Sequence, residues 1–235
     1  MKNEILRGLL DEIRAKRPVV LATRLDSGEG FLFDPFAERS SVDPAVQGAG
    51  REAALADRSG LVETAAGRFF LRVFNPPVSV VIVGAVHIAQ ALAPMVKLAG
   101  YDVLLIDPRR AFAAQERFPG IPLLSEWPDE ALARVGLGRR SAVVTMTHDP
   151  KIDDPALVAA LRSEAFYIGA LGSKKTQAAR RERLAGLGFG ERDLARLHGP
   201  VGLPIGASST GEIAVSILSQ LVGCLRQPGG ARAGA

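Results

Sequence analysis

Residues 78–108 constrain the fold of this chain most strongly, because apolar and glycine-containing segments alternate there in a fixed order. A short run of β-branched residues comes first, and its length is typical of a strand buried on both faces. Gly84 then begins a turn, an apolar helix is predicted over residues 88–99, and a second apolar run ends at Asp107. This is the order of elements in a dinucleotide-binding βαβ unit. The sequence therefore predicts a Rossmann-like parallel sheet.

The turn departs from the glycine fingerprint of that unit. Val86 stands where the second glycine of G-x-G-x-x-G lets the backbone approach a pyrophosphate, whereas Ala89 is acceptable at the third position. Asp107 follows Gly84 at about the spacing (~20 residues) of a carboxylate that binds a ribose hydroxyl. Arg109 and Arg110, which follow Asp107, can meet the 2′-phosphate of NADP. Two interpretations stay open: NAD(P) binding, or a Rossmann-like scaffold that binds no dinucleotide in the standard pose.

Size and composition narrow the class of protein. The 235 residues suit one large or two small domains. Because 47% of the residues are hydrophobic but only 6% are aromatic, the composition favours α/β layers over a β-sandwich. A net charge of +4 without interleaved aromatic and basic residues argues against nucleic-acid binding but suits an anionic ligand. The single cysteine, Cys224, excludes an internal disulfide and a cysteine-based zinc site. The sequence has no apolar signal core and no apolar run of about 18 residues, so we expect a cytoplasmic protein without membrane contact.

Asn75-Pro76-Pro77 is the best domain boundary, since consecutive prolines make a stiff, extended linker. Residues 1–75 are expected to form a small α+β domain. Residues 76–228 are expected to form a Rossmann-like, doubly wound α/β domain, and the small-residue tail at 229–235 is expected to be disordered.

Further strands are predicted in the second domain, alternating with helices, at residues 103–106, 121–124, 142–146 and 166–168. The helices between and after these strands are predicted at residues 111–117, 128–135 and 153–161, from residue 174 onward and at residues 210–225. With the strand at 78–83 numbered first, the expected order is 3-2-1-4-5, whose switch point lies between the first and fourth strands. The turns after the strands then share one edge of the sheet. They carry the cofactor-binding candidates Gly84, Ala85, Val86, His87, Asp107, Arg109, Thr147, His148, Gly169, Gly172, Ser173 and Lys174.

The bend at residues 169–173 is the strongest candidate for an anion site. Its glycines permit a backbone nest, Ser173 can cap the following helix, and Lys174 adds positive charge. The alternative is an ordinary strand-to-helix turn, followed by a solvated basic face with Arg180, Arg181 and Arg183.

Two histidines face the same predicted crevice. His87 and His148, with one carboxylate, match a ligand set for zinc or iron, although no HxxxH or HxxE pattern supports a metal site. Each histidine has an alternative role in a helix cap or a turn. Glu212 is a further cofactor-binding candidate, but Ser209-x-x-Glu212 also fits a capping box, which needs no ligand.

Five sequence blocks, in this order, make the chain similar to the xanthine dehydrogenase accessory protein family, XdhC/CoxI. They lie within residues 77–225 and read VIVGAVHIAQALAPM, DPRRAF with ERFP, TMTHDPKIDDPAL, FYIGALGSKKT and PVGLPIGASSTGEIAVSIL. The resemblance implies a maturation factor that binds the molybdenum-pterin cofactor and assists its sulfuration and its insertion into a xanthine dehydrogenase-type molybdenum hydroxylase. It also implies, as partners, the hydroxylase apoenzyme, a cysteine desulfurase and a second copy of the chain in a homodimer.

Two other functions stay open. An NAD(P)-dependent oxidoreductase of a small anionic substrate would use the same crevice, but the sequence has no Tyr-x-x-x-Lys or comparable proton donor. A non-catalytic interaction scaffold is compatible with the loss of the second glycine. We rank a cofactor chaperone above a catalyst, with the pterin phosphate at residues 169–173 and with His87 and His148 near the metal.

Overall fold

A computed structural model of the chain describes residues 3–40 and 42–227. The tail predicted to be disordered, 229–235, lies outside the described residues. Contacts divide the chain between Pro76 and Pro77 into two compact units. Within the described residues, no helix is long and apolar enough to cross a membrane.

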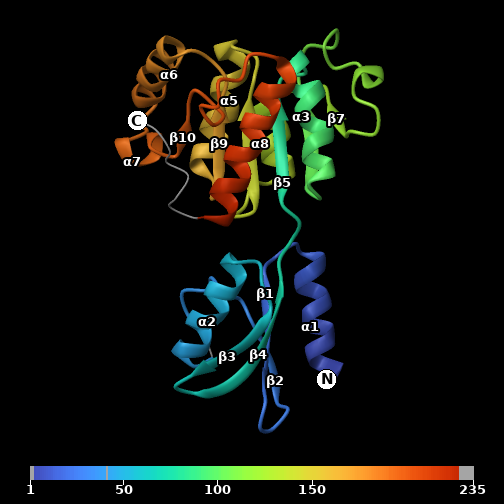
Figure 1. The fold of residues 1–235 in the computed structure, drawn as a ribbon, viewed down its shortest axis with the longest axis vertical. Helices are drawn as coiled ribbons and strands as arrows, with labels where there is room; N and C mark the ends of the chain where they lie inside the picture. Colours follow the sequence, from blue (N-terminus) through green and yellow to red (C-terminus); the bar gives the residue numbers. More distant parts are fainter. Residues whose placement is uncertain (1–2, 41, 228–235) are drawn as a thin grey trace. The chain divides into compact units, whose positions relative to one another are not determined.

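The first unit is a four-stranded antiparallel sheet with a helix on each side (Figure 1). Its strands are β1 (Val19–Arg24), β2 (Gly30–Phe33), β3 (Gly60–Thr64) and β4 (Gly67–Phe74), in the order β2-β1-β4-β3. Helix α1 (Asn3–Arg14) contacts β1 and β2. Helix α2 (Pro44–Leu55) packs on the core around Phe33 and Phe69. Gly50 of α2 is needed there, because a β-carbon would lie 2.5 Å from the ring of Phe33.

The second unit contains a six-stranded, all-parallel sheet (Figure 1). Its strands are β5 (Ser79–Val83), β6 (Asp102–Ile106), β7 (Leu123–Leu124), β8 (Ser141–Thr145), β9 (Tyr167–Ala170) and β10 (Leu197–His198). The order β10-β9-β8-β5-β6-β7 confirms the predicted order of the first five strands. Because β5 pairs with both β6 and β8, the switch point lies where it was predicted. The sequence does not predict β10, since Leu197 is its one apolar residue and the Gly- and Pro-containing segment that begins at Gly199 follows directly.

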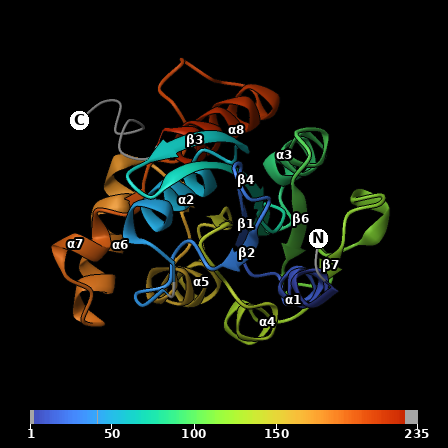
Figure 2. The same ribbon diagram turned by 90° about the horizontal axis from the view of Figure 1, so that it is seen from below.

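Helices cover both faces of this sheet (Figure 2). Helices α3 (His87–Leu98) and α8 (Thr210–Arg226) pack together on the face that contains Val80 and Ile82. Helices α4 (Pro128–Val135) and α5 (Pro150–Arg162) cover the face that contains Val81 and Val83. Helices α6 (Lys174–Gly186) and α7 (Glu191–Leu194) continue from α5 on this side. Successive residues of β5 point to opposite faces, so its unbroken apolar run is buried on both.

Two predicted helices differ from their observed counterparts. The helix predicted at residues 111–117 is a single 3-10 turn, η1 (Gln115–Arg117). Helix α5 begins at Pro150 instead of residue 153, because Asp149 is its N-cap and accepts a hydrogen bond from the Lys151 N–H at 2.9 Å. Asp153 is 1% exposed, so it is a core carboxylate and not the solvated first residue of a helix.

Candidate functional site

The turns that follow β5 and β8 meet at the carboxyl edge of the parallel sheet. Gly84 follows β5 with a φ of +112°, which favours glycine, and its N–H donates to Ile106 O of β6 at 2.8 Å. A β-carbon at Gly84 would lie 2.6 Å from Thr147 Cγ2, in the turn after β8. Gly84 is therefore required by the close approach of the two turns, independently of any dinucleotide.

Asp107, the predicted ribose ligand, is fully buried, and neighbouring residues occupy its carboxylate. Oδ2 accepts hydrogen bonds from the Ala85 N–H and from Arg109 Nη2, each at 2.7 Å. Oδ1 accepts from the N–H and the Nε of Arg109, each at 2.9 Å. Burial alone would raise the pKa of Asp107. The four hydrogen bonds and the charge of Arg109 lower it by more, so the pKa of this carboxyl lies below its usual value. Asp107 and Arg109 thus join the β5–α3 turn to the turn after β6.

Arg117, which sequence reasoning missed, holds the same turn through a different contact. Its Nη1 donates to Ala85 O at 2.9 Å and to Phe112 O at 2.8 Å. Helix α3 begins at the exposed His87, and its N-cap is Val86, whose side chain cannot accept a hydrogen bond. The first turn of α3 therefore presents N–H groups at the edge where Rossmann folds bind anions.

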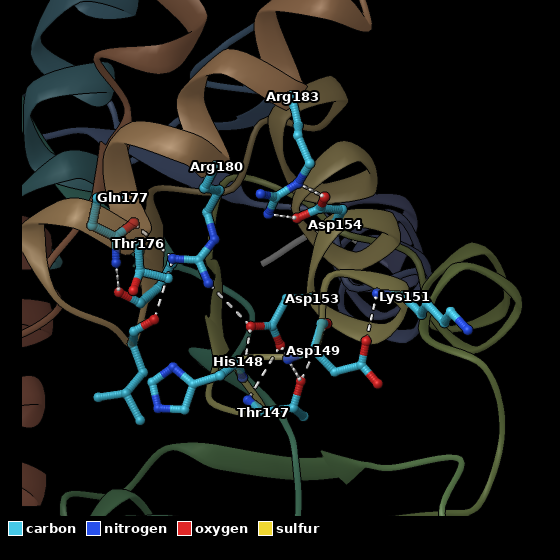
Figure 3. A network of polar contacts seen from close by, with 12 residues as sticks. Thr147, His148, Asp149, Lys151, Asp153, Asp154, Thr176, Gln177, Arg180 and Arg183 are labelled. Carbon is cyan, nitrogen blue, oxygen red and sulfur yellow. Dashed lines mark hydrogen bonds and ion pairs between the residues drawn. The ribbon is translucent and has the colours of Figure 1, made fainter.

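A buried ion pair joins the turns that follow β8 and β9 (Figure 3). Asp153 of α5 and Arg180 of α6 are each 1% exposed, and Arg180 Nη2 lies 3.1 Å from Asp153 Oδ2. Asp153 Oδ1 accepts hydrogen bonds from Thr147 Oγ1 at 2.7 Å and from the Thr147 N–H at 3.2 Å. Asp153 Oδ2 also accepts from the His148 N–H at 3.2 Å. The carboxylate therefore fixes both Thr147 and His148.

Arg180 extends this network to the end of β9. Its Nη1 donates to Leu171 O at 3.2 Å and to Gln177 Oε1 at 2.7 Å, and Gln177 Nε2 donates to Ala170 O at 2.8 Å. The pKa of Asp153 lies above its usual value, because burial outweighs the hydrogen bonds from Thr147 and His148 and the charge of Arg180, which lower it. Burial likewise shifts the pKa of Arg180 below its usual value. Desolvation therefore opposes the charged state of both partners, as in other ion pairs inside proteins.

The alternative interpretation, a solvated basic face, is wrong for Arg180, and a signal for the burial of this residue is present in the sequence. Leu184 is the sole large apolar residue in KKTQAARRERLAG, the sequence of α6. Gln177 and Arg180 precede Leu184 on the same helical face, and all three are buried. Arg183 lies on another face, where it is exposed and pairs with Asp154 at 2.6 Å.

The predicted anion-binding bend is shorter than expected. Gly169 belongs to β9, where a β-carbon would lie 2.6 Å from Val201 Cγ2, so Gly169 is a packing residue and not part of the bend. Gly172, with a φ of +138°, and Ser173 form the bend itself, and Ser173 caps α6 as predicted. Lys174 is the exposed first residue of α6.

Both candidate histidines are exposed, His87 at the start of α3 and His148 between β8 and α5. Across residues 3–40 and 42–227, no group of three or more His, Cys, Asp or Glu side chains is placed to hold a metal ion. Both histidines are therefore exposed side chains, and within the described residues the structure does not assemble the three-ligand metal site considered from the sequence.

Glu212 forms the capping box that the sequence predicts. Its Oε2 accepts from the N–H groups of Ser208 and Ser209, each at 2.9 Å, while the Glu212 N–H donates to Ser209 Oγ at 3.2 Å. These hydrogen bonds, the backbone bond from Ser209 first, lower the pKa of Glu212 to about 2. Helix capping accounts for this carboxylate without a ligand.

Replacing Ser209 by alanine is expected to lower the free energy of unfolding by about 1 kcal/mol, the usual effect of losing a side-chain cap. The midpoint of thermal unfolding should fall by about 2–4 °C for a chain of this size. Ser219→Ala, at an exposed position of the same helix, is the matched control and should not lower the midpoint. An unchanged midpoint in Ser209→Ala would contradict a stabilising role for the capping box.

Comparisons with known proteins concern mainly the second unit. The sequence profile of the XdhC Rossmann domain matches residues 80–221. The molybdenum cofactor insertion chaperone PaoD of Escherichia coli (strain K12) is 30% identical over 148 residues, which are 63% of this chain and 40% of PaoD. A probable xanthine dehydrogenase subunit of Bacillus subtilis (strain 168) is 29% identical over 154 residues, which are 65% of this chain and 44% of that protein. The chain thus spans less than half the length of these curated relatives.

A solved structure shares the fold of the chain. The crystal structure of a xanthine dehydrogenase from Bacillus halodurans aligns with a TM-score of 0.64 and 24% sequence identity. The alignment covers 98% of this chain and 66% of that one. At this identity the likeness bears on the fold alone.

Proposed function

The chain belongs to the XdhC Rossmann-domain family, and from this premise we propose that it is a maturation factor for a molybdenum hydroxylase of the xanthine dehydrogenase type. In this role it binds the molybdenum-pterin cofactor and assists its insertion into the apoenzyme. The observation that carries the proposal is the 30% identity to a protein named molybdenum cofactor insertion chaperone. The name of the Bacillus subtilis relative, which describes a probable xanthine dehydrogenase component, supports the class of client enzyme.

The carboxyl edge of the parallel sheet has groups that suit this cofactor, whose phosphate and oxo groups are anionic or electron-rich. His87 and His148 are exposed hydrogen-bonding side chains, and Lys174 supplies a positive charge. The first turn of α3, which the side chain of Val86 cannot cap, supplies backbone N–H donors. These groups would hold the cofactor, while Gly84, Ala85, Asp107, Arg109, Thr147, Gly169, Gly172 and Ser173 shape the turns that carry them.

An NAD(P)-dependent oxidoreductase is less well supported by the contacts at this edge. Binding a ribose hydroxyl requires a free carboxylate at Asp107, whose two oxygens are engaged by Ala85 and Arg109. Binding a 2′-phosphate requires a free guanidinium at Arg109, which is held by the same carboxylate. Val86 also occupies the position where a glycine would admit the pyrophosphate.

Further parts of the proposal depend on the resemblance of the five sequence blocks. They are a role in sulfuration of the cofactor, a cysteine desulfurase as the sulfur donor, a homodimer and a cytoplasmic location. Because the chain spans less than half the length of its curated relatives, each of these needs its own test on this protein.

Protein coexpressed with an active molybdenum-cofactor pathway is expected to retain molybdenum and pterin in comparable molar amounts. Elemental analysis measures the metal, and fluorescence of the oxidised pterin measures the organic part. The matched control is the same protein from a strain that cannot make the cofactor, which should carry neither. Micromolar affinity for NADH or NADPH in a calorimetric titration would instead favour the oxidoreductase.

Two outcomes would contradict the chaperone proposal. One is a purified protein that is empty and also fails to take up cofactor released from a hydroxylase. The other concerns the double variant with His87→Ala and His148→Ala. If this variant retains no cofactor but still captures the apoenzyme and supports its full activation, cofactor binding is not the function of the chain. That second result would favour the interaction scaffold.

A further inference from the structure

His148 has a backbone conformation that side-chain-bearing residues seldom adopt. Its φ is +64°, in the left-handed region, where the β-carbon crowds the backbone and glycine is favoured. In the described part of the second unit, every other residue with a positive φ is a glycine. The sequence thus keeps an imidazole at a position where glycine would fit with less strain.

Helix ends explain the two other described non-glycine residues with positive φ, but not His148. Lys16 follows α1 and Asp57 follows α2, where a left-handed residue commonly terminates a helix. His148 instead lies between strand β8 and Asp149, the N-cap of α5. Its conformation therefore has another cause.

Asp153, which is buried and paired with Arg180, holds the backbone at His148. Asp153 Oδ2 accepts the His148 N–H at 3.2 Å, and Asp153 Oδ1 holds the preceding residue, Thr147, through its Oγ1 at 2.7 Å. Arg180 Nη2 reaches the same Asp153 Oδ2 from α6 at 3.1 Å. Two helices thus fix one strained residue with charged groups that are costly to bury. Such surplus support around a strained residue is typical of functional sites.

The side chain of His148 is available for a ligand. It is exposed at the carboxyl edge. Figure 3 shows its imidazole extending away from Asp149 and Lys151, toward the side of the network where Thr176 and Gln177 lie. In this view the ring lies on the side of the network where α6 begins (Figure 3).

We propose that His148 contacts the molybdenum-pterin cofactor, its imidazole donating a hydrogen bond to a phosphate or oxo oxygen, and that Asp153 and Arg180 are its positioning residues. This inference rests on the proposed function and assigns a contact residue to it. A contact between His148 and the cofactor explains two features together: the strained backbone of His148 and the buried charges of Asp153 and Arg180 that hold it.

The decisive variant is His148→Gly, which removes the imidazole and relieves the backbone. The midpoint of thermal unfolding is expected to rise by about 2–4 °C, because glycine adopts this φ without crowding. The dissociation constant for cofactor released from xanthine dehydrogenase is expected to rise about tenfold or more, the effect of losing a hydrogen bond to a charged group. A gain in stability together with a loss of affinity is a result that a merely structural residue would not produce.

Lys16→Gly is the matched control, because it relieves a similar φ at a residue of the first unit that is not part of the candidate site. It should raise the midpoint and leave cofactor affinity unchanged. The positioning role is tested with Asp153→Asn at a temperature where that variant is folded. Its affinity should also fall, and adding His148→Gly to it should cause little further loss.

The outcomes separate this inference from the proposed function. Wild-type protein that takes up no cofactor overturns the proposed function and, with it, the role of His148. Wild-type protein that binds cofactor, with unchanged affinity in His148→Gly, overturns the role of His148 alone. A lowered midpoint in His148→Gly would contradict the premise that the backbone is strained.

Discussion

The Arg180→Met variant is expected to lose about 3–5 kcal/mol of unfolding free energy, the usual result of removing one partner of a buried ion pair. Methionine replaces much of the apolar stem of the arginine, so the loss reports mainly the unpaired charge of Asp153, which is 1% exposed. Leu171 O and Gln177 Oε1 lose a donor in the same variant. Urea unfolding near neutral pH, followed by far-UV circular dichroism, measures the difference.

Arg183→Met is the matched control for this experiment. Arg183 belongs to the same helix and pairs with Asp154, but its side chain is 39% exposed, so its removal should change the unfolding free energy by at most about 1 kcal/mol. The double variant with Asp153→Asn and Arg180→Met should lose less than the sum of the two single variants, because it leaves no buried charge unpaired. Similar losses in Arg180→Met and Arg183→Met would show that burial of the first pair does not matter.

The parallel sheet of the second unit could be predicted because its signals are local. The first five strands are short apolar runs, most crossovers contain a helical pattern, and the right-handed crossover rule leaves few ways to order the strands. The position of the ligand-binding edge then follows from strand direction, without knowledge of any side-chain contact. β10 was not predicted because it has a single apolar residue, whereas β7, of the same length, ends a longer apolar run at residues 121–124.

The Asp153–Arg180 pair could not be predicted in the same way, because its partners are 27 positions apart. Each lies among other charged residues, in IDDPAL and in AARRERL, so that composition suggests a solvated surface. The helical spacing from Leu184 back to Arg180 indicates a buried face, but it does not name a partner for the guanidinium. Only the packing of α5 against α6 selects Asp153.

Asp107 and Arg109 illustrate the opposite limitation. Sequence spacing places both residues at the correct edge of the sheet, and the structure confirms that placement. Their partners, however, are protein groups, since Asp107 binds Ala85 and Arg109 instead of leaving its oxygens free for a ribose. A motif fixes where a side chain lies more reliably than it fixes what that side chain binds.

Asp107→Asn is accordingly expected to lower the unfolding free energy by about 2–3 kcal/mol near neutral pH. Hydrogen bonds to a charged group are worth about 1.5–3 kcal/mol, and the amide of asparagine would turn a donor toward the Ala85 N–H or the Arg109 guanidinium. Asp102→Asn, at the exposed start of β6, the strand that Asp107 follows, is the matched control and should stay within about 0.5 kcal/mol of wild type. Urea unfolding of the full chain compares the three proteins.

The destabilisation by Asp107→Asn should also depend on pH in one direction. The pKa of Asp107 is lower in the folded protein than in the unfolded chain, so the unfolded chain takes up this proton first as the pH falls. The stabilisation is then fully present above the unfolded pKa of about 3.9 and is lost as the pH falls through the folded value. Unfolding curves should give the same difference from wild type at about pH 7 and about pH 5, and a smaller one near pH 3. A difference that persists undiminished under the most acidic conditions would mean that hydrogen-bond geometry, and not the ionised carboxylate, holds the β5–α3 turn.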